Sequence, residues 1–195
     1  MMAAMSTFEL SSRQIEAFNS EGFIVCPRLA SVDVCENLKQ IAEMHLRELI
    51  APIEYEVDVG YPGAPVDKNA PGARTSRRLL QAYARDVAFR DWATSEGLAE
   101  VLGQLFGSQD RLMLSQCHHN CVMTKISGFN SVTLWHQDIR YWSFDEENLI
   151  SVWLALGEEN RSNGCLRVLP GSHHHELDRG RLDAAMFLQI GRAHV

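Results

Sequence analysis

The sequence predicts an α+β protein, with helices in the first half of the chain packed on a strand-rich second half. Over residues 1–107 apolar side chains recur at three- and four-residue spacing, which is the period of amphipathic helices. Over residues 108–175 short apolar or alternating runs are divided by turn residues such as Ser127-Gly128. Several short strands at this spacing indicate a sandwich or a barrel.

The first helices carry start and stop signals. Ser11 and Gln14 form a capping-box pattern, and Gly22 ends the helix that follows. The short apolar run over 23–25 predicts a strand. A longer helix is expected over 31–50, capped by the serine at its start.

The middle of the chain predicts a loop followed by further helices. Residues 51–73 are dense in proline and glycine, which predicts one long loop of a kind that often serves as a functional lid. Helices are expected again over 74–83 and over 98–105, the second ending at Gly107. Four strand-like runs complete the plan: 111–125, 135–141, 149–156 and 165–169. A barrel needs about eight strands, so four runs form only part of one.

Composition excludes several classes of protein. The 195 residues include 18 basic and 25 acidic side chains, and the formal charge of −7 argues against a general nucleic-acid binder. No apolar run approaches the roughly 18 residues of a membrane span, and the N-terminal residues lack the pattern of a signal peptide. Five cysteines, an odd number, favour reduced thiols. These features predict a cytoplasmic protein without nucleic-acid or membrane partners, and they leave its oligomeric state open.

The most specific chemical motif is Trp135-His136-Gln137-Asp138. Residues i and i+2 of a strand point to the same face, so His136 and Asp138 are expected side by side. An imidazole and a carboxylate in this arrangement can chelate one metal ion. Two histidines and one carboxylate, with open positions beside them, are the ligand set of non-haem Fe(II) oxygenases.

Three sequence blocks resemble the phytanoyl-CoA dioxygenase family of Fe(II)- and 2-oxoglutarate-dependent hydroxylases. They are Trp135 to Asp138, NLISVWLAL from Asn148 to Leu156, and NGCLRVLPGSH from Asn163 to His173. A looser similarity reaches back to Phe18-x3-Gly22-Phe23 and to RRLLQ from Arg77 to Gln81. The resemblance implies one domain over residues 1–189, with N-terminal helices followed by a double-stranded β-helix, the cupin-like jelly roll.

The resemblance also implies roles for single residues. His136 and Asp138 match the first two iron ligands of the family. Trp153 matches a tryptophan that lines the 2-oxoglutarate pocket in relatives, and Cys121 falls where some relatives place a methionine beside that cosubstrate. The expected cofactors are therefore Fe(II) and 2-oxoglutarate, and the expected partners are O2 and a small organic substrate that becomes hydroxylated.

Two family features have no counterpart in this chain. A third ligand, which is a histidine, and an arginine that binds 2-oxoglutarate lie several strands beyond the Pro-Gly-Ser-His block in the family, and His173 to His175 come too early to replace them. We therefore expect a jelly roll that is incomplete at its C-terminus and a chain with negligible turnover. Residues 190–195, IGRAHV, read like translated sequencing adapter, so they are interpreted as a non-native tail.

Other interpretations of the same residues stay open. Cys117, His119 and Cys121 alternate onto one strand face, where they either hold zinc in a non-catalytic cupin-like module or line the barrel interior. A jelly roll without any metal is a third possibility.

Basic residues outside the motif also have two interpretations. The cluster of Arg74, Arg77 and Arg78 either holds an anionic substrate or the 2-oxo acid, or forms a solvated helix face. The tract from His173 to His175 is expected in a solvated loop, and His45 is expected to be a packed or surface residue.

Overall fold

The computed structural model describes residues 8–108, 112–116, 120–142, 144 and 148–175. The chain divides into two compact units built from alternating stretches of sequence. Over the described residues, the first unit comprises 8–44, 81–120 and 150–175, and the second comprises 45–80 and 121–149. The proposed tail at 190–195 lies outside the described residues.

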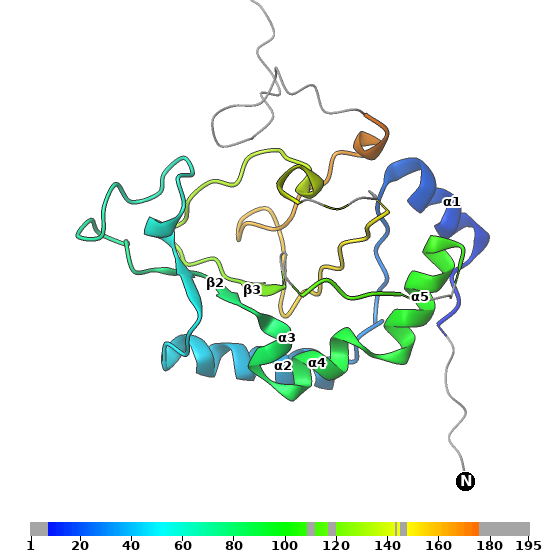
Figure 1. Ribbon diagram of the computed structural model, residues 1–195, viewed down its shortest axis with the longest axis horizontal. Helices are drawn as coiled ribbons and strands as arrows, with labels where there is room; N and C mark the ends of the chain where they lie inside the picture. Colours follow the sequence, from blue (N-terminus) through cyan, green and yellow to red (C-terminus); the bar gives the residue numbers. More distant parts are fainter. Residues whose placement is uncertain (1–7, 109–111, 117–119, 143, 145–147, 176–195) are drawn as a thin grey trace, which may run out of the picture. The chain divides into compact units, whose positions relative to one another are not determined.

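The first unit contains most of the helices (Figure 1). They are α1 (Ser12–Glu21), α2 (Val32–Arg47, which continues into the second unit), α3 (Ala82–Arg85), α4 (Val87–Ala93), α5 (Glu96–Phe106) and the 3-10 helix η3 (Ser172–His174).

The predicted signals at the ends of α1 are confirmed. The Ser11 hydroxyl accepts a hydrogen bond from the backbone N–H of Gln14 at 3.4 Å, and the Ser11 N–H donates to the Gln14 side chain at 3.0 Å. Gly22 ends the helix in the left-handed conformation with a φ of 82°. α2 begins as expected after Ser31, but it ends at Arg47, and Leu49 beyond it has a positive φ. The predicted end of this helix at residue 50 is therefore wrong.

Apolar side chains from several elements form the core of the first unit. The buried residues are Leu10, Leu38, Ala42, Phe89, Leu98 and Val101. The segment before α1 is tied to α5 by the side-chain amide of Gln104, which accepts from the N–H of Leu10 at 2.8 Å and donates to the carbonyl of Phe8 at 2.9 Å. Helix packing in this unit thus follows the apolar spacing of the sequence.

The second unit contains a three-stranded antiparallel sheet (Figure 1). Its strands, in spatial order, are β1 (Ile53–Tyr55), β2 (Ser76–Leu80) and β3 (Cys121–Met123). In the backbone register of the sheet, Arg78 of β2 lies opposite Glu54 of β1 and Met123 of β3, and Leu80 lies opposite Cys121. Because side chains alternate along a strand, Arg78 and Cys121 share one face of the sheet, whereas Arg77 belongs to the other face.

The predicted helix over 74–83 is wrong in its first part, which forms β2. Strands on both sides pair with this segment, and a hydrogen-bonded ladder outweighs a local preference for helix. Gln81, in the left-handed conformation, then separates β2 from α3. The single loop predicted over 51–73 is also wrong in part, because it begins with β1 and the 3-10 helix η1 (Glu56–Asp58).

Other predicted strands are not found in the part of the chain that the structure describes. Of the run over 111–125 only β3 is a strand, and 23–25, 149–156 and 165–169 have no ladder partner. The run over 135–141 instead contains the 3-10 helix η2 (Asp138–Tyr141). Helices combined with an antiparallel sheet agree with the α+β prediction, and the double-stranded β-helix stays a prediction.

None of the described helices has both the length and the apolar character needed to cross a membrane.

Candidate metal site

His136 and Asp138 lie together in the second unit, as their spacing predicts. His136 Nε2 is 3.2 Å from Asp138 Oδ1, and both side chains are partly exposed. The local structure differs from the expected strand, because Asp138 is the first residue of η2 and Gln137 is its N-cap. The start of this helical turn, rather than strand alternation, brings the imidazole and the carboxylate to the same place.

A backbone carbonyl orients the imidazole of His136. His136 Nδ1 lies 2.8 Å from the carbonyl oxygen of Leu134. A carbonyl only accepts, so this contact is a hydrogen bond when Nδ1 carries the proton. In that tautomer the Nε2 lone pair faces the Asp138 carboxylate, and metal-binding histidines have this same arrangement, with the other ring nitrogen donating to a carbonyl or carboxylate. The pair therefore fits a divalent metal ion such as Fe(II), with one nitrogen and one oxygen donor.

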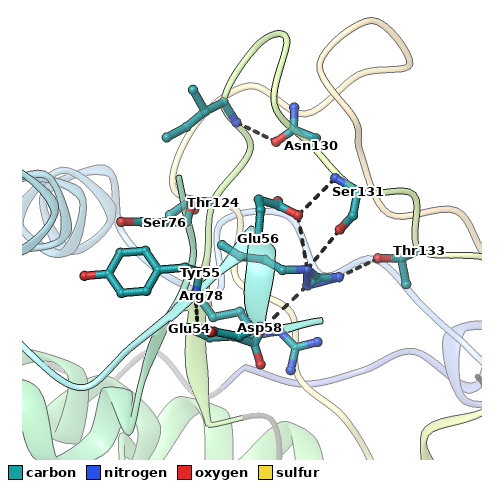
Figure 2. Close-up of polar contacts among 12 residues, drawn as sticks. Glu54, Tyr55, Glu56, Asp58, Ser76, Arg78, Thr124, Asn130, Ser131 and Thr133 are labelled. Carbon is teal, nitrogen blue, oxygen red and sulfur yellow. Dashed lines mark hydrogen bonds and ion pairs between the residues drawn. The ribbon is translucent and has the colours of Figure 1, made fainter. Parts of the chain in front are cut away.

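The segment that leads into His136 is held by a buried arginine. Arg77 on β2 donates from Nη2 to the Thr133 hydroxyl at 2.8 Å and from Nε to the Ser131 hydroxyl at 3.3 Å. The backbone N–H of Ser131 donates to Glu56 Oε2 at 3.0 Å. Figure 2 shows Glu56, Ser131 and Thr133 directed toward one guanidinium.

Charges of both signs are buried in this cluster. The side chains of Arg77 and Glu56 are each only 2% exposed, and Arg77 Nε is 3.9 Å from Glu56 Oε2. Glu54 Oε1 lies 3.7 Å from Arg77 Nη1 and 3.2 Å from Arg78 Nε. Burial and the neighbouring Arg78 lower the pKa of Arg77, whereas Glu54 and Glu56 oppose this shift. The ring of Tyr61 covers the guanidinium at 4.7 Å from its centroid.

Of the two interpretations of these arginines, the solvated helix face is wrong for Arg77 and Arg78. Arg77 and Arg78 lie on a strand and pair with carboxylates. Arg74 is exposed and lies in the loop before β2, with its guanidinium 5.4 Å from the ring centroid of Tyr55.

Cys121 lies on β3, on the face of the sheet that also carries Arg78. Burial raises the pKa of the Cys121 thiol, and the negative charges of Glu54 and Asp138 act in the same direction. The positive charges of Arg78 and Arg77 oppose them. The thiol therefore lies within electrostatic range of Asp138, and the raised pKa keeps it protonated at neutral pH.

Trp153 belongs to the first unit. It is 47% exposed, and its Nε1–H donates to both carboxylate oxygens of Glu159, at 2.8 and 3.0 Å. Its predicted place in a 2-oxoglutarate pocket stays a prediction.

The zinc interpretation depends on residues that the structure does not describe, because Cys117 and His119 lie outside the described ranges. Within those ranges no group of three or more His, Cys, Asp or Glu side chains is placed to hold a metal ion. The same finding means that no third ligand accompanies His136 and Asp138 there. Among the described residues all four cysteines, Cys26, Cys35, Cys121 and Cys165, are free thiols.

The remaining histidines agree with their simpler interpretations. His45 is buried at the end of α2. The tract from His173 to His175 is exposed, and the Nε2 atoms of His173 and His174 contact the carbonyl oxygen of Asn19 at 3.0 and 3.1 Å. These two imidazoles therefore contact the last turn of α1.

Comparison with known proteins identifies the family. The family model of phytanoyl-CoA dioxygenase (PhyH) matches residues 18–190, which is most of the chain. The chain therefore belongs to the phytanoyl-CoA dioxygenase family, and the resemblance seen in the three sequence blocks is confirmed.

Individual relatives differ widely in identity. The chain is 51% identical to the peroxisomal phytanoyl-CoA dioxygenase of Mus musculus over 86% of its own length and 49% of the relative's. The chain is 26% identical to the peroxisomal phytanoyl-CoA dioxygenase of Rattus norvegicus over 86% of its own length and 49% of the relative's. It is 25% identical to the ectoine dioxygenase of Sphingopyxis alaskensis, over 86% and 51% of the two chains. A probable alpha-ketoglutarate-dependent hypophosphite dioxygenase of Stutzerimonas stutzeri is 24% identical over 54% of this chain and 35% of its own.

The chain thus spans about half the length of these phytanoyl-CoA and ectoine dioxygenases. No solved structure matches it significantly.

Sequence reasoning missed the buried cluster of Glu54, Glu56, Arg77, Ser131 and Thr133. The available signal was a pair of acidic residues two apart, followed about twenty residues later by adjacent arginines. Such a pattern indicates opposite charges on paired strands only when both segments are interpreted as strands. Here one was interpreted as a loop and the other as a helix.

Proposed function

We propose that this chain binds Fe(II) through His136 and Asp138 and contributes to the 2-oxoglutarate-dependent hydroxylation of a small organic substrate. The observation that carries the proposal is the 3.2 Å approach of His136 Nε2 to Asp138 Oδ1, with Nδ1 anchored on a carbonyl. Membership of the phytanoyl-CoA dioxygenase family supports it. So does the name of the S. stutzeri relative, which is alpha-ketoglutarate-dependent.

Each described residue has a defined task in this proposal. Fe(II) and 2-oxoglutarate, when bound, supply the activation of O2 that hydroxylation needs. His136 and Asp138 bind the metal, and the carbonyl of Leu134 holds the imidazole in the tautomer that presents Nε2. Cys121, as a neutral thiol, forms part of the wall beside the cosubstrate. The family resemblance supports the proposal that Trp153 lines a 2-oxoglutarate pocket.

Arg78 is a candidate for attracting the anionic 2-oxo acid. It shares a sheet face with Cys121, and it acts electrostatically on that thiol. Its Nε is buried without a hydrogen bond, although it lies 3.2 Å from Glu54 Oε1. A guanidinium carries five N–H donors in a planar fork, so Arg78 can bind a carboxylate ligand while Nε stays beside Glu54.

We further infer that the sheet of the second unit belongs to a double-stranded β-helix of which residues 8–175 show only part. A third histidine ligand and the arginine that grips the far carboxylate of 2-oxoglutarate are proposed to be absent from this chain. Two protein ligands hold a metal more weakly than three. We therefore expect little succinate formation by these 195 residues.

The names of the relatives point to phytanoyl-CoA, ectoine and hypophosphite as substrates of those proteins. Because these named substrates differ so much in chemistry, we propose only that the substrate of this chain is a small molecule. A cytoplasmic location remains our proposal from composition, and the rat relative is named a peroxisomal protein.

An anaerobic titration with Fe(II), or with Mn(II) as a redox-stable substitute, tests the proposed site. We expect one ion per chain in the presence of 2-oxoglutarate, with binding lost in His136→Ala and in Asp138→Ala. His174→Ala, which removes an exposed imidazole in η3, is the matched control and should bind as the unmodified chain does.

Two outcomes would overturn the proposal. One is metal binding that survives both substitutions at the His-x-Asp pair. The other is stoichiometric zinc that is lost on replacing Cys121 and Cys117 but not His136, which would establish the zinc module instead. Succinate release is measured alongside metal binding to test the expected low turnover. Robust turnover would show that a third ligand is present.

A further inference from the structure

The geometry points to Arg77 as a positioning residue for the metal-binding histidine, a role that deepens the proposed function and rests on it. Arg77 does not touch the proposed metal ligands. It holds Ser131 and Thr133, two of the three residues that precede Leu134, and Leu134 supplies the carbonyl that orients His136.

The first step in the argument is that Arg77 itself has a fixed position. It lies in the central strand of the sheet, its side chain is 2% exposed, and Glu54 of β1 and Glu56 of η1 approach its guanidinium. The ring of Tyr61 covers it. A buried guanidinium between two carboxylates and an aromatic ring has little freedom to move, so it is a suitable anchor.

The second step is that the anchor holds one face of an extended segment. Ser131 and Thr133 are two residues apart, so their side chains point to the same side, and both accept from Arg77, at 3.3 and 2.8 Å. Backbone bonds secure the same stretch, because Ser131 N–H donates to Glu56 at 3.0 Å and Val132 N–H donates to the carbonyl of Pro62 at 2.8 Å. Four hydrogen bonds therefore hold residues 131–133.

The third step connects this segment to the imidazole. Leu134 follows Thr133 directly, and its carbonyl oxygen lies 2.8 Å from His136 Nδ1. When residues 131–133 are held, the Leu134 carbonyl is held as well, and Nε2 then points at Asp138. Outer partners that orient a metal-binding histidine typically contribute 10–100-fold to metal affinity. Arg77 acts one step further out, through Thr133 and Leu134.

A mild substitution separates positioning from folding. Thr133→Val keeps the shape of the side chain and removes only the acceptor for Arg77, whereas Thr133→Ser keeps the hydroxyl. Val132→Thr is the matched control, because Val132 is an exposed neighbour whose backbone bond to Pro62 survives the change. Arg77→Lys keeps the charge and removes the planar fork that contacts both hydroxyls.

The first readout needs no metal. The ¹⁵N chemical shifts of the His136 imidazole, assigned by their loss in His136→Gln, report which nitrogen carries the proton at about pH 8.5, where an ordinary imidazole is neutral. Because the Asp138 carboxylate competes for the proton at Nε2 in the metal-free chain, this comparison is made in an Asp138→Ala background. There we expect the Nδ1–H form to predominate, and to remain predominant when Val132→Thr or Thr133→Ser is added. Thr133→Val and Arg77→Lys should show a mixture of tautomers while the far-ultraviolet circular dichroism spectrum is unchanged.

The second readout is the Mn(II) affinity in the presence of 2-oxoglutarate. Thr133→Val should weaken it by about 10-fold, the lower end of the range for an outer partner, and Thr133→Ser should restore it. Unchanged tautomers and unchanged affinity in Thr133→Val, with only a lower melting temperature, would overturn the proposal and leave Arg77 a purely structural residue. If the unmodified chain binds no metal, the proposed function fails, and the imidazole shifts alone still decide whether Arg77 positions His136.

Discussion

The carboxylate of Glu56 accepts a hydrogen bond from the backbone N–H of Ser131, 75 residues further along the chain, at 3.0 Å. The side chain of Glu56 is only 2% exposed and lies 3.9 Å from the guanidinium of Arg77. A buried carboxylate is tolerated when it is both paired with a charge and hydrogen-bonded, and Glu56 meets both conditions. It therefore joins η1, directly after β1, to the segment that leads into the candidate metal site.

Glu56→Ala should lower the free energy of unfolding by about 3 kcal/mol, the lower end of the range for breaking a buried ion pair, because Glu54 still faces Arg77. A urea denaturation curve followed by circular dichroism measures the change. Glu48→Ala removes an exposed carboxylate near Arg47 and should change stability by less than about 0.5 kcal/mol. Equal effects of the two substitutions would contradict the buried pairing.

Gly22→Ala should be destabilising for two separate reasons. The residue has a φ of 82°, which costs an L-residue about 1–2 kcal/mol, and an added Cβ would overlap the imidazole of His173. Gly128→Ala is the matched control, since Gly128 has a φ of 85° and an added methyl group there would meet nothing within 4 Å. We expect the larger loss of melting temperature for Gly22→Ala, and partial recovery when His173→Ala is added. Equal losses would show that the contact with His173 is absent in solution.

Alkylation of Cys121 should require a higher pH than alkylation of an ordinary thiol. Burial raises the pKa of this thiol, so the reactive thiolate forms only above the usual range. Site-resolved mass spectrometry of iodoacetamide labelling, compared with the chain unfolded in urea, gives the two pH profiles. Arg78→Gln removes a charge that lowers the pKa, and it should move the profile of the folded chain further upward.

The raised pKa of the Cys121 thiol also makes the free energy of unfolding depend on pH. The folded state retains the Cys121 proton more strongly than the unfolded state does. The contribution of the protonated thiol to stability is therefore complete below the pKa that this thiol has in the unfolded chain, and it is lost as the pH rises through the pKa of the folded chain. Cys121→Ala should remove this dependence. Coincident labelling profiles for folded and unfolded chains would contradict the burial of the thiol.

Ser11→Ala should cost about 1 kcal/mol, because it removes the hydroxyl that caps α1 and leaves the backbone N–H of Gln14 without that acceptor. Thermal unfolding measures the loss. Ser12→Ala, one residue further on and inside the helix, should have little effect or a small stabilising one. A larger loss for Ser12→Ala than for Ser11→Ala would show that the cap lies elsewhere.

Local features of this chain were readable from sequence because their causes are local. The capping box at Ser11, the stop at Gly22 and the helix that ends at Gly107 each depend on residues three or four positions apart. The His-x-Asp spacing likewise brought His136 and Asp138 together, although a helical turn does so instead of the expected strand. The family was readable too, because its sequence blocks are specific.

Pairing across long sequence distances could not be read in this way. β2 resembles a helix when taken alone, and it is a strand because Ile53–Tyr55 and Cys121–Met123 supply hydrogen-bond partners on both sides. For the same reason Arg77, for which a solvated helix face was one of two interpretations, is buried against two carboxylates of β1 and η1.

By itself the sequence determined the helix signals, the pair of candidate ligands and membership of the phytanoyl-CoA dioxygenase family. Only the tertiary structure decided that a buried arginine holds Ser131 and Thr133 ahead of His136 and that the backbone carbonyl of Leu134 lies 2.8 Å from His136 Nδ1. The physical reason is that spacing along a chain specifies which residues share a face, whereas burial, charge pairing and the orientation of an imidazole depend on segments that meet only after folding.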